Sequence, residues 1–416
     1  MSLSLVKPIV SMAPNAVQSW RWIHIVVAAL LMVATLPGRT HGLGLFTEPI
    51  LRTFGLTRDT YGFMNLWATL IGATFCFPCG WFTDRIGTRA VAVVVMLLLA
   101  ATVFGLSLWT GGLIGLFIFI LLTRGLGQSA LSVGSLTLLG KSVSPKSGME
   151  MAVYSCLISI GFFGAFGILR QVVKSNPEEW RTPWAGIGVG VLVIAALSVF
   201  LIRESSLVSF TKNDDEFDSS KTFSQAIKSS EFWIFALGTS FYGMISSGIS
   251  LFNESILSER GFAKEIFLNA TVIGIPIGLL ANLTSGWLVM KFNLIKVFSS
   301  MLTLLTVTLA FYPFLHLEWE VYLYTCLLAA SGGGITVCFF TVWKQLYGVK
   351  ELGRIQGAAQ FLTVLGSAAG PSLFAYSKSQ FATYVPMFLI CIISSMLLVI
   401  ASWVVSFRMV DQGIKR

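Results

Sequence analysis

Residues 80–89 read Gly-Trp-Phe-Thr-Asp-Arg-Ile-Gly-Thr-Arg and join two apolar runs, 60–83 and 89–110. Each run is long enough to cross the ~30 Å hydrocarbon core of a bilayer as a helix. Gly80 and Gly87 let helix ends approach closely and turn sharply. The stretch therefore predicts a short hairpin between two membrane-spanning helices.

The charges of this hairpin predict more than a turn. Asp84 comes at a helix end, where it can face the N-terminus of a neighbouring helix or a basic group. Arg85 and Arg89 hold the loop on one side of the membrane. We expect Gly80, Asp84, Arg85, Gly87 and Arg89 to form a gate motif; the simpler alternative is that the charges only fix the topology.

The same apolar pattern recurs along the chain. Hydrophobic residues make up 55% of the 416 and charged residues only 11%, too few to cover a soluble surface. We expect an all-α integral membrane protein with twelve spans, near 22–53, 60–83, 89–110, 112–140, 149–172, 183–203, 231–258, 264–290, 294–315, 319–347, 352–376 and 383–408.

The basic residues follow the loops between these runs. Of the 28 Lys and Arg, 18 fall on the side of both termini, 8 on the other side and 2 inside spans. This bias predicts cytoplasmic termini in a plasma (inner) membrane protein, and it explains the net charge of +9 without nucleic acid. We expect a monomer surrounded by lipid.

The two halves of the chain repeat each other. Residues 45–51 (LFTEPIL) align with 251–257 (LFNESIL) at a shift of 206, and the same shift relates Gly80-Trp81 to Gly286-Trp287. We expect two pseudo-symmetric six-helix bundles, 1–203 and 231–416. The polar segment 204–230 would be a cytoplasmic linker, with an acidic run at 214–218 and a short amphipathic helix near 223–227 on the membrane surface.

The hairpin resembles the signature loop of the major facilitator superfamily, Gly-x-x-x-Asp-Arg-x-Gly-x-Arg, at all five fixed positions. Arg124-Gly125 resembles a second superfamily motif, and Trp180-Arg181 fits a common superfamily pattern. The resemblance implies alternating access about a site at the bilayer midplane. In that family the loop latches the cytoplasmic side shut.

Three further stretches resemble the monocarboxylate-transporter and oxalate/formate-antiporter branch: Gly42-x-Gly44-x-Phe46-x-Glu48, the approach 223–233 to span 7, and 352–357 entering span 11. Transporters of that branch usually carry an arginine in span 8 for the substrate carboxylate. Span 8 of this chain, 264–290, has none.

Charged side chains inside a membrane are costly, so Arg39 and Arg124 are the first candidates for a binding site. Arg39 follows Pro37-Gly38, which weaken the helix, and would anchor a substrate or gate; the alternative is that it snorkels to the interface. Arg124 lies deep in its span, with Gln128 one turn away. It would bind an anion or couple to protons, or else be a structural hydrogen-bond hub.

Other polar residues are secondary candidates. His41 titrates near neutral pH and either carries a proton or packs. The repeat-related pair Glu48 and Glu254 either carries a proton or forms salt bridges at the outer mouth. We expect four more polar side chains to face the cavity: Gln356, Gln360, Tyr242 and Asn253.

The function expected from these residues is secondary active transport of a small organic anion such as a monocarboxylate, by symport or antiport with protons or a counter-substrate. The alternatives are an exporter of amphipathic compounds and a non-transporting membrane sensor, which would need no polar residues at its centre. The glycines at 134 and 140 before Lys141-Ser142 do not have phosphate-loop spacing. We therefore expect no enzyme, no catalytic residues, no metal and no cofactor.

Overall fold

The computed structural model describes residues 14–144, 148–175, 179–204 and 220–411. These residues form helices joined by short connections: α1 (Pro14–Val33), η1 (Leu36–Gly38), α2 (Thr40–Gly44), α3 (Thr47–Phe54), α4 (Arg58–Ala73), α5 (Cys76–Ile86), α6 (Thr88–Leu108), α7 (Leu113–Thr123), η2 (Arg124–Leu131), α8 (Ser132–Ser142), α9 (Gly148–Ser175), α10 (Arg181–Leu201), α13 (Phe223–Ile227), α14 (Ser230–Glu259), α15 (Lys264–Lys291), α16 (Leu294–Phe311), η3 (Tyr312–Phe314), α17 (Glu318–Tyr347), α18 (Leu352–Phe381) and α19 (Val385–Asp411).

Twelve helical segments within the described ranges are long and apolar enough to cross a membrane, from Trp20–Gly38 to Val385–Arg408. Large apolar side chains cover the outside of the bundle; Phe200, for example, is 75% exposed. Such a surface is stable only in lipid. The expected fold class is therefore confirmed.

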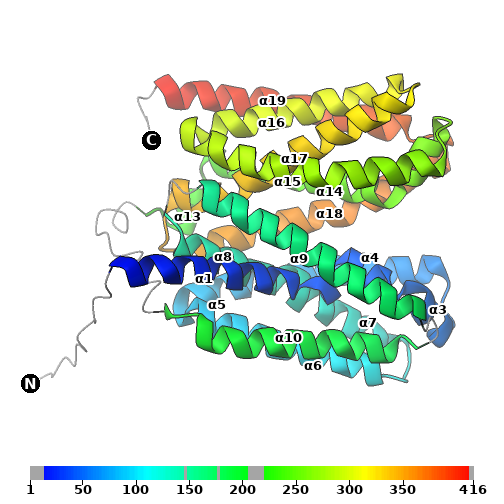
Figure 1. Ribbon diagram of the computed structural model, residues 1–416, viewed down its shortest axis with the longest axis horizontal. Helices are drawn as coiled ribbons and strands as arrows, with labels where there is room; N and C mark the ends of the chain where they lie inside the picture. The colour runs from blue at the N-terminus through cyan, green and yellow to red at the C-terminus, as the bar shows by residue number, and fades with distance from the viewer. Residues whose placement is uncertain (1–13, 145–147, 176–178, 205–219, 412–416) are drawn as a thin grey trace, which may run out of the picture.

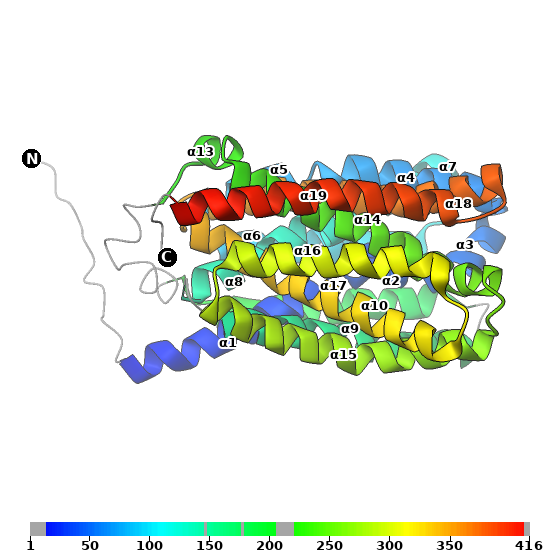
Figure 2. The same ribbon diagram turned by 90° about the horizontal axis from the view of Figure 1, so that it is seen from above.

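The helices run side by side along the long axis of the molecule, with α1–α10 in one half and α14–α19 in the other (Figure 1). α1 begins and α19 ends at the same end of the bundle in both views, which we call the terminal side (Figure 2). α13 lies at this end too, over the stretch where the sequence suggests a short helix. The expected acidic run at 214–218 lies outside the described residues.

The first expected span, 22–53, is not one continuous helix. α1 gives way to η1, α2 and α3 around Pro37 and Gly38. Proline has no N–H to donate and its ring clashes with the preceding turn, so a helix breaks there. The second span is interrupted in the same way between α4 and α5, just before Pro78.

Candidate anion site

The break in the first span lies directly against span 4. A Cβ on Gly38 would come 2.5 Å from the carbonyl oxygen of Thr123 and 2.6 Å from the backbone nitrogen of Gln128, so only glycine fits between the two backbones. Span 4 is wound as a π-helix over η2, Arg124–Leu131. Single π-turns inside α-helices are frequent at functional sites. The two irregular segments thus meet next to Arg124, which is buried at the start of η2.

Arg124 is a hydrogen-bond hub at this crossing. Its Nη1 donates to the carbonyl of Gly38 at 3.0 Å, to Thr40 Oγ1 at 3.2 Å and to Gln128 Oε1 at 3.2 Å, and its Nη2 donates to Asn65 Oδ1 at 3.0 Å. The side chain is only 4% exposed. Arg124 therefore ties the broken first span to spans 2 and 4 from inside the bundle.

Arg39 is held differently. Its Nε donates to Thr35 Oγ1 at 3.0 Å, and its Nη2 contacts Ser132 Oγ at 2.9 Å and Met32 Sδ at 3.0 Å. Its Nη1 has no hydrogen-bond partner among the described residues. The guanidinium is thus fixed on two sides and leaves one nitrogen available.

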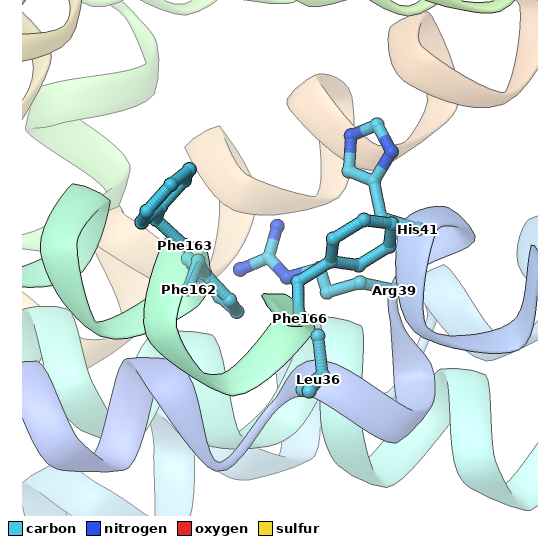
Figure 3. A pocket seen from close by; sticks show the side chains of 6 residues that line it. All are labelled: Leu36, Arg39, His41, Phe162, Phe163 and Phe166. Atoms are coloured by element: carbon cyan, nitrogen blue, oxygen red, sulfur yellow. The ribbon is translucent and has the colours of Figure 1, made fainter. Parts of the chain in front are cut away.

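Arg39 lines a cavity of about 370 Å³ whose other walls are Leu36, His41, Phe162, Phe163 and Phe166 (Figure 3). The phenylalanines come from α9, more than half-way along that helix from the terminal side. The Arg39 guanidinium carbon is 5.9 Å from the centroid of the Phe162 ring, within the range of a cation–π contact. Arg39 therefore lines a cavity whose other walls are largely aromatic.

No carboxylate forms an ion pair with Arg39 or Arg124 within the part of the chain that the structure describes. Buried charges are normally paired, because desolvating an ion costs several kcal/mol. Two guanidinium groups at this depth create a positive potential that only a negative charge from elsewhere can balance.

The two candidate glutamates lie away from this cavity. Glu48 pairs with Arg58 at 2.8 Å and Glu254 pairs with Lys264 at 3.1 Å, and both carboxylates are about half exposed. The partners are themselves related by the shift of 206. Each glutamate therefore forms a salt bridge with the first residue of the helix that follows it, Arg58 of α4 or Lys264 of α15.

The remaining candidates are spread over the second half. Gln356 does not face the cavity: its Oε1 accepts from Thr137 Oγ1 at 3.0 Å and its Nε2 donates to the Leu136 carbonyl at 3.2 Å, joining the two halves. Gln360 is buried one turn further along α18. Tyr242 packs against Gly332, and Asn253 is half-buried near the far end of α14.

Sequence reasoning missed most of the cavity. Of the proposed site residues, only Arg39 and His41 line it. Phe162 and Phe166 lie four residues apart on one face of α9 and project together from it, but the apolar residues around them give no sign of which face lines a cavity. The π-helical winding of span 4 had no sequence signal either.

The two halves meet at the terminal side. Asp84 accepts hydrogen bonds from the backbone nitrogens of Gly353 at 2.9 Å and Arg354 at 3.0 Å, and it lies 3.7 Å from Lys141 Nζ. It therefore caps the N-terminus of α18, where a carboxylate interacts favourably with the helix dipole. A Cβ on Gly80 would lie 2.3 Å from the Gly353 carbonyl oxygen, so glycine is required for this approach.

The rest of the signature loop stabilises the turn. Gly87 has φ +103°, a conformation that side chains disfavour. The Arg85 guanidinium lies 4.3 Å from the Trp81 ring centroid, and the Arg89 backbone nitrogen donates to Glu204 Oε1 at 2.7 Å. These contacts hold Asp84 against the opposite half.

In a second contact between the halves, a charged side chain of the second half binds a helix end of the first half. Lys344 of α17, only 3% exposed, donates through Nζ to the carbonyl of Val143 at the end of α8. A cation at a helix C-terminus is the counterpart of a carboxylate at an N-terminus. At the far ends, Trp180 donates to Thr53 and Lys378 donates to Glu259, each bond within one half.

Comparison with known proteins agrees with this architecture. Residues 39–371 match the family model of the Major Facilitator Superfamily, which is most of the chain. The chain therefore belongs to the Major Facilitator Superfamily, whose members are transporters and not enzymes. A search of curated protein sequences found no match.

Solved structures share the fold at low identity. The transporter FucP in its outward conformation is 15% identical, with a TM-score of 0.68 over 92% of this chain and 98% of its own. The proton:xylose symporter XylE, bound to 6-bromo-6-deoxy-D-glucose, is 14% identical, with a TM-score of 0.70 over 93% and 96%. The human organic anion transporter MFSD10 (TETRAN) is 14% identical, with a TM-score of 0.62 over 94% and 99%.

Proposed function

We propose that this protein is a secondary active transporter of a small organic anion, with Arg39 as the group that holds the anionic charge. The observation that carries the proposal is that Arg39 lines the cavity while its Nη1 has no hydrogen-bond partner and its guanidinium no paired carboxylate among the described residues. A bound anion supplies the missing charge and the missing hydrogen-bond acceptor.

Arg124 has a different role in this proposal. Its Nη1 already has three acceptors, and the side chain lies behind the break in span 1. It fixes the Gly38 carbonyl and Thr40 on either side of Arg39, with Gln128 as its partner. Arg124 is therefore a positioning residue, and it adds to the positive potential that an anion experiences at Arg39.

Alternating access follows from the contacts between the halves. With the terminal side joined by Asp84 and Lys344, the cavity serves solute from the opposite side. Access from the terminal side requires Asp84 to release the N-terminus of α18. The distribution of Lys and Arg supports a cytoplasmic terminal side in the plasma membrane.

Among the branches of the superfamily, the monocarboxylate and oxalate/formate transporters remain the proposed relatives. α15 has no arginine, so the carboxylate would be recognised from span 1 instead of span 8. For coupling to protons, His41 is the titratable group that lines the cavity together with Arg39. Exchange for a second anion needs no titratable group.

The second candidate is export of amphipathic compounds, and the apolar walls of the cavity favour it. Four of its six lining residues are Leu36, Phe162, Phe163 and Phe166. An exporter and an importer differ in the direction of the driving gradient, not in the chemistry of the site. The sign of the pH gradient that drives accumulation separates them.

The test is uptake into proteoliposomes of labelled monocarboxylates and of a neutral sugar, with a pH gradient of either sign and with none. We expect saturable uptake of an anion, and its loss in Arg39→Gln. The matched control is Arg58→Gln, an exposed arginine outside the cavity, which should transport normally. Uptake of the sugar alone, or unimpaired anion uptake by Arg39→Gln, would falsify the proposal.

A further inference from the structure

The walls of the Arg39 cavity are aromatic on one side. Phe162, Phe163 and Phe166 come from consecutive turns of α9, and Figure 3 shows the Arg39 guanidinium pointing toward Phe162 and Phe163. A guanidinium and a group of phenyl rings together match a ligand that has an anionic end and an apolar, ring-shaped end. Neither feature alone has this preference.

The size of the cavity also limits the ligand. Its volume is about 370 Å³, which leaves room for several waters beside a small acid. A two- or three-carbon acid would leave most of that water against phenylalanine rings. A ring-bearing acid displaces it and gains the free energy of apolar burial.

The polar groups of the cavity are few. Among the described residues that line it, Arg39 and His41 are the two whose side chains can form hydrogen bonds. A sugar presents hydroxyl groups around its whole ring, and each one buried without a partner weakens binding. An aromatic acid needs polar partners at one end only.

We propose that the substrate is an organic acid with an aromatic ring, its carboxylate on Arg39 Nη1 and its ring between Phe162 and Phe166. This inference rests on the proposed anion transport and narrows it to one class of anion. It assigns the three phenylalanines as specificity-determining residues. Acetate, formate and lactate are poor ligands under it, because they fill the charged end of the cavity only.

The experiment is a calorimetric titration of the purified full chain with phenylacetate and with acetate. We expect phenylacetate to bind at least about tenfold more tightly. Phe162→Ala and Phe166→Ala should each weaken phenylacetate binding about tenfold and leave acetate binding unchanged. Phe200→Ala, which removes the same side chain from the lipid-facing surface of α10, is the control and should bind both like the wild type.

The outcomes distinguish the aromatic substrate from anion transport in general. Equal binding of the two acids, or alanine variants that weaken both acids alike, overturns the aromatic substrate and leaves anion transport standing. Failure to bind either acid, in protein with a cooperative thermal transition, overturns anion recognition as well. Phe162→Leu and Phe166→Leu keep apolar volume and should retain folding where the alanine variants lose it.

Discussion

The two halves of the molecule share one architecture but not one chemistry. At the repeat shift of 206, Arg39 corresponds to Ile245 and Arg124 corresponds to Ala330. The second half thus forms the same six-helix bundle with apolar residues where the first half has two guanidinium groups. Because the second half forms its bundle without these charges, we attribute Arg39 to function, whereas Arg124 also supports the first half through its hydrogen bonds.

What the halves share is structural. The ion pairs Glu48–Arg58 and Glu254–Lys264 occupy equivalent positions at equivalent helix ends. Exposed pairs of this kind contribute little to stability. The comparison therefore separates the repeated architecture, which appears twice, from the proposed anion site, which appears once.

The largest expected effect is on stability, when an apolar side chain replaces a buried arginine of the first half. Arg124→Met removes the donor to Gly38, Asn65 and Gln128 and leaves their buried acceptors unpaired. We expect a loss of about 3 kcal/mol in the free energy of unfolding, measured by denaturant titration in detergent micelles. Ala330→Met puts the same side chain at the equivalent site and should change stability by under ~1 kcal/mol; equal losses in the two variants contradict the asymmetry.

The next effect concerns the contact between the halves. Asp84→Asn removes the negative charge from the N-terminus of α18, which should favour opening of the terminal side by about 1 kcal/mol. Double electron–electron resonance between spin labels at Ile86 and Lys350, in a chain without its native cysteines, should show a longer distance becoming more populated. The repeat position Met290 is the control, since Met290→Asn removes no such cap; identical distributions for Asp84→Asn and wild type argue against the latch.

The smallest effect is expected where the halves are alike. The double variant Glu48→Gln with Glu254→Gln removes two exposed ion pairs, worth roughly 0.2–1 kcal/mol each at low salt. The dependence of anion uptake on pH should remain that of the wild type. A flattened pH profile would make these glutamates the coupling groups. The residues that the two halves share would then be functional and not only structural.

The sequence was sufficient for the architecture because its signals are local or repeated. Each apolar run is read within one window, and the match of Gly80–Arg89 to the superfamily loop is confirmed by the family as a whole. The position of Asp84 at a helix end suggested a partner of the kind that α18 provides.

The site itself could not be derived in this way. Sequence alone predicts both Arg39 and Arg124 as site residues, whereas exposure to the cavity depends on where the chain breaks at Gly38 and how span 4 winds. Phe162 and Phe166 belong to a run rich in apolar residues, where nothing local distinguishes cavity from lipid. Both facts follow from packing between spans far apart in the sequence.

The central claim is that one half of the molecule binds the charge of the substrate through Arg39. Equilibrium binding of labelled phenylacetate to wild type, Arg39→Gln and the control Arg58→Gln tests it most directly. We predict a loss of about 10- to 100-fold in affinity for Arg39→Gln, the value of a charge-assisted hydrogen bond, and none for Arg58→Gln. Unchanged affinity in folded Arg39→Gln protein would contradict the claim and leave Arg124 as the remaining arginine candidate.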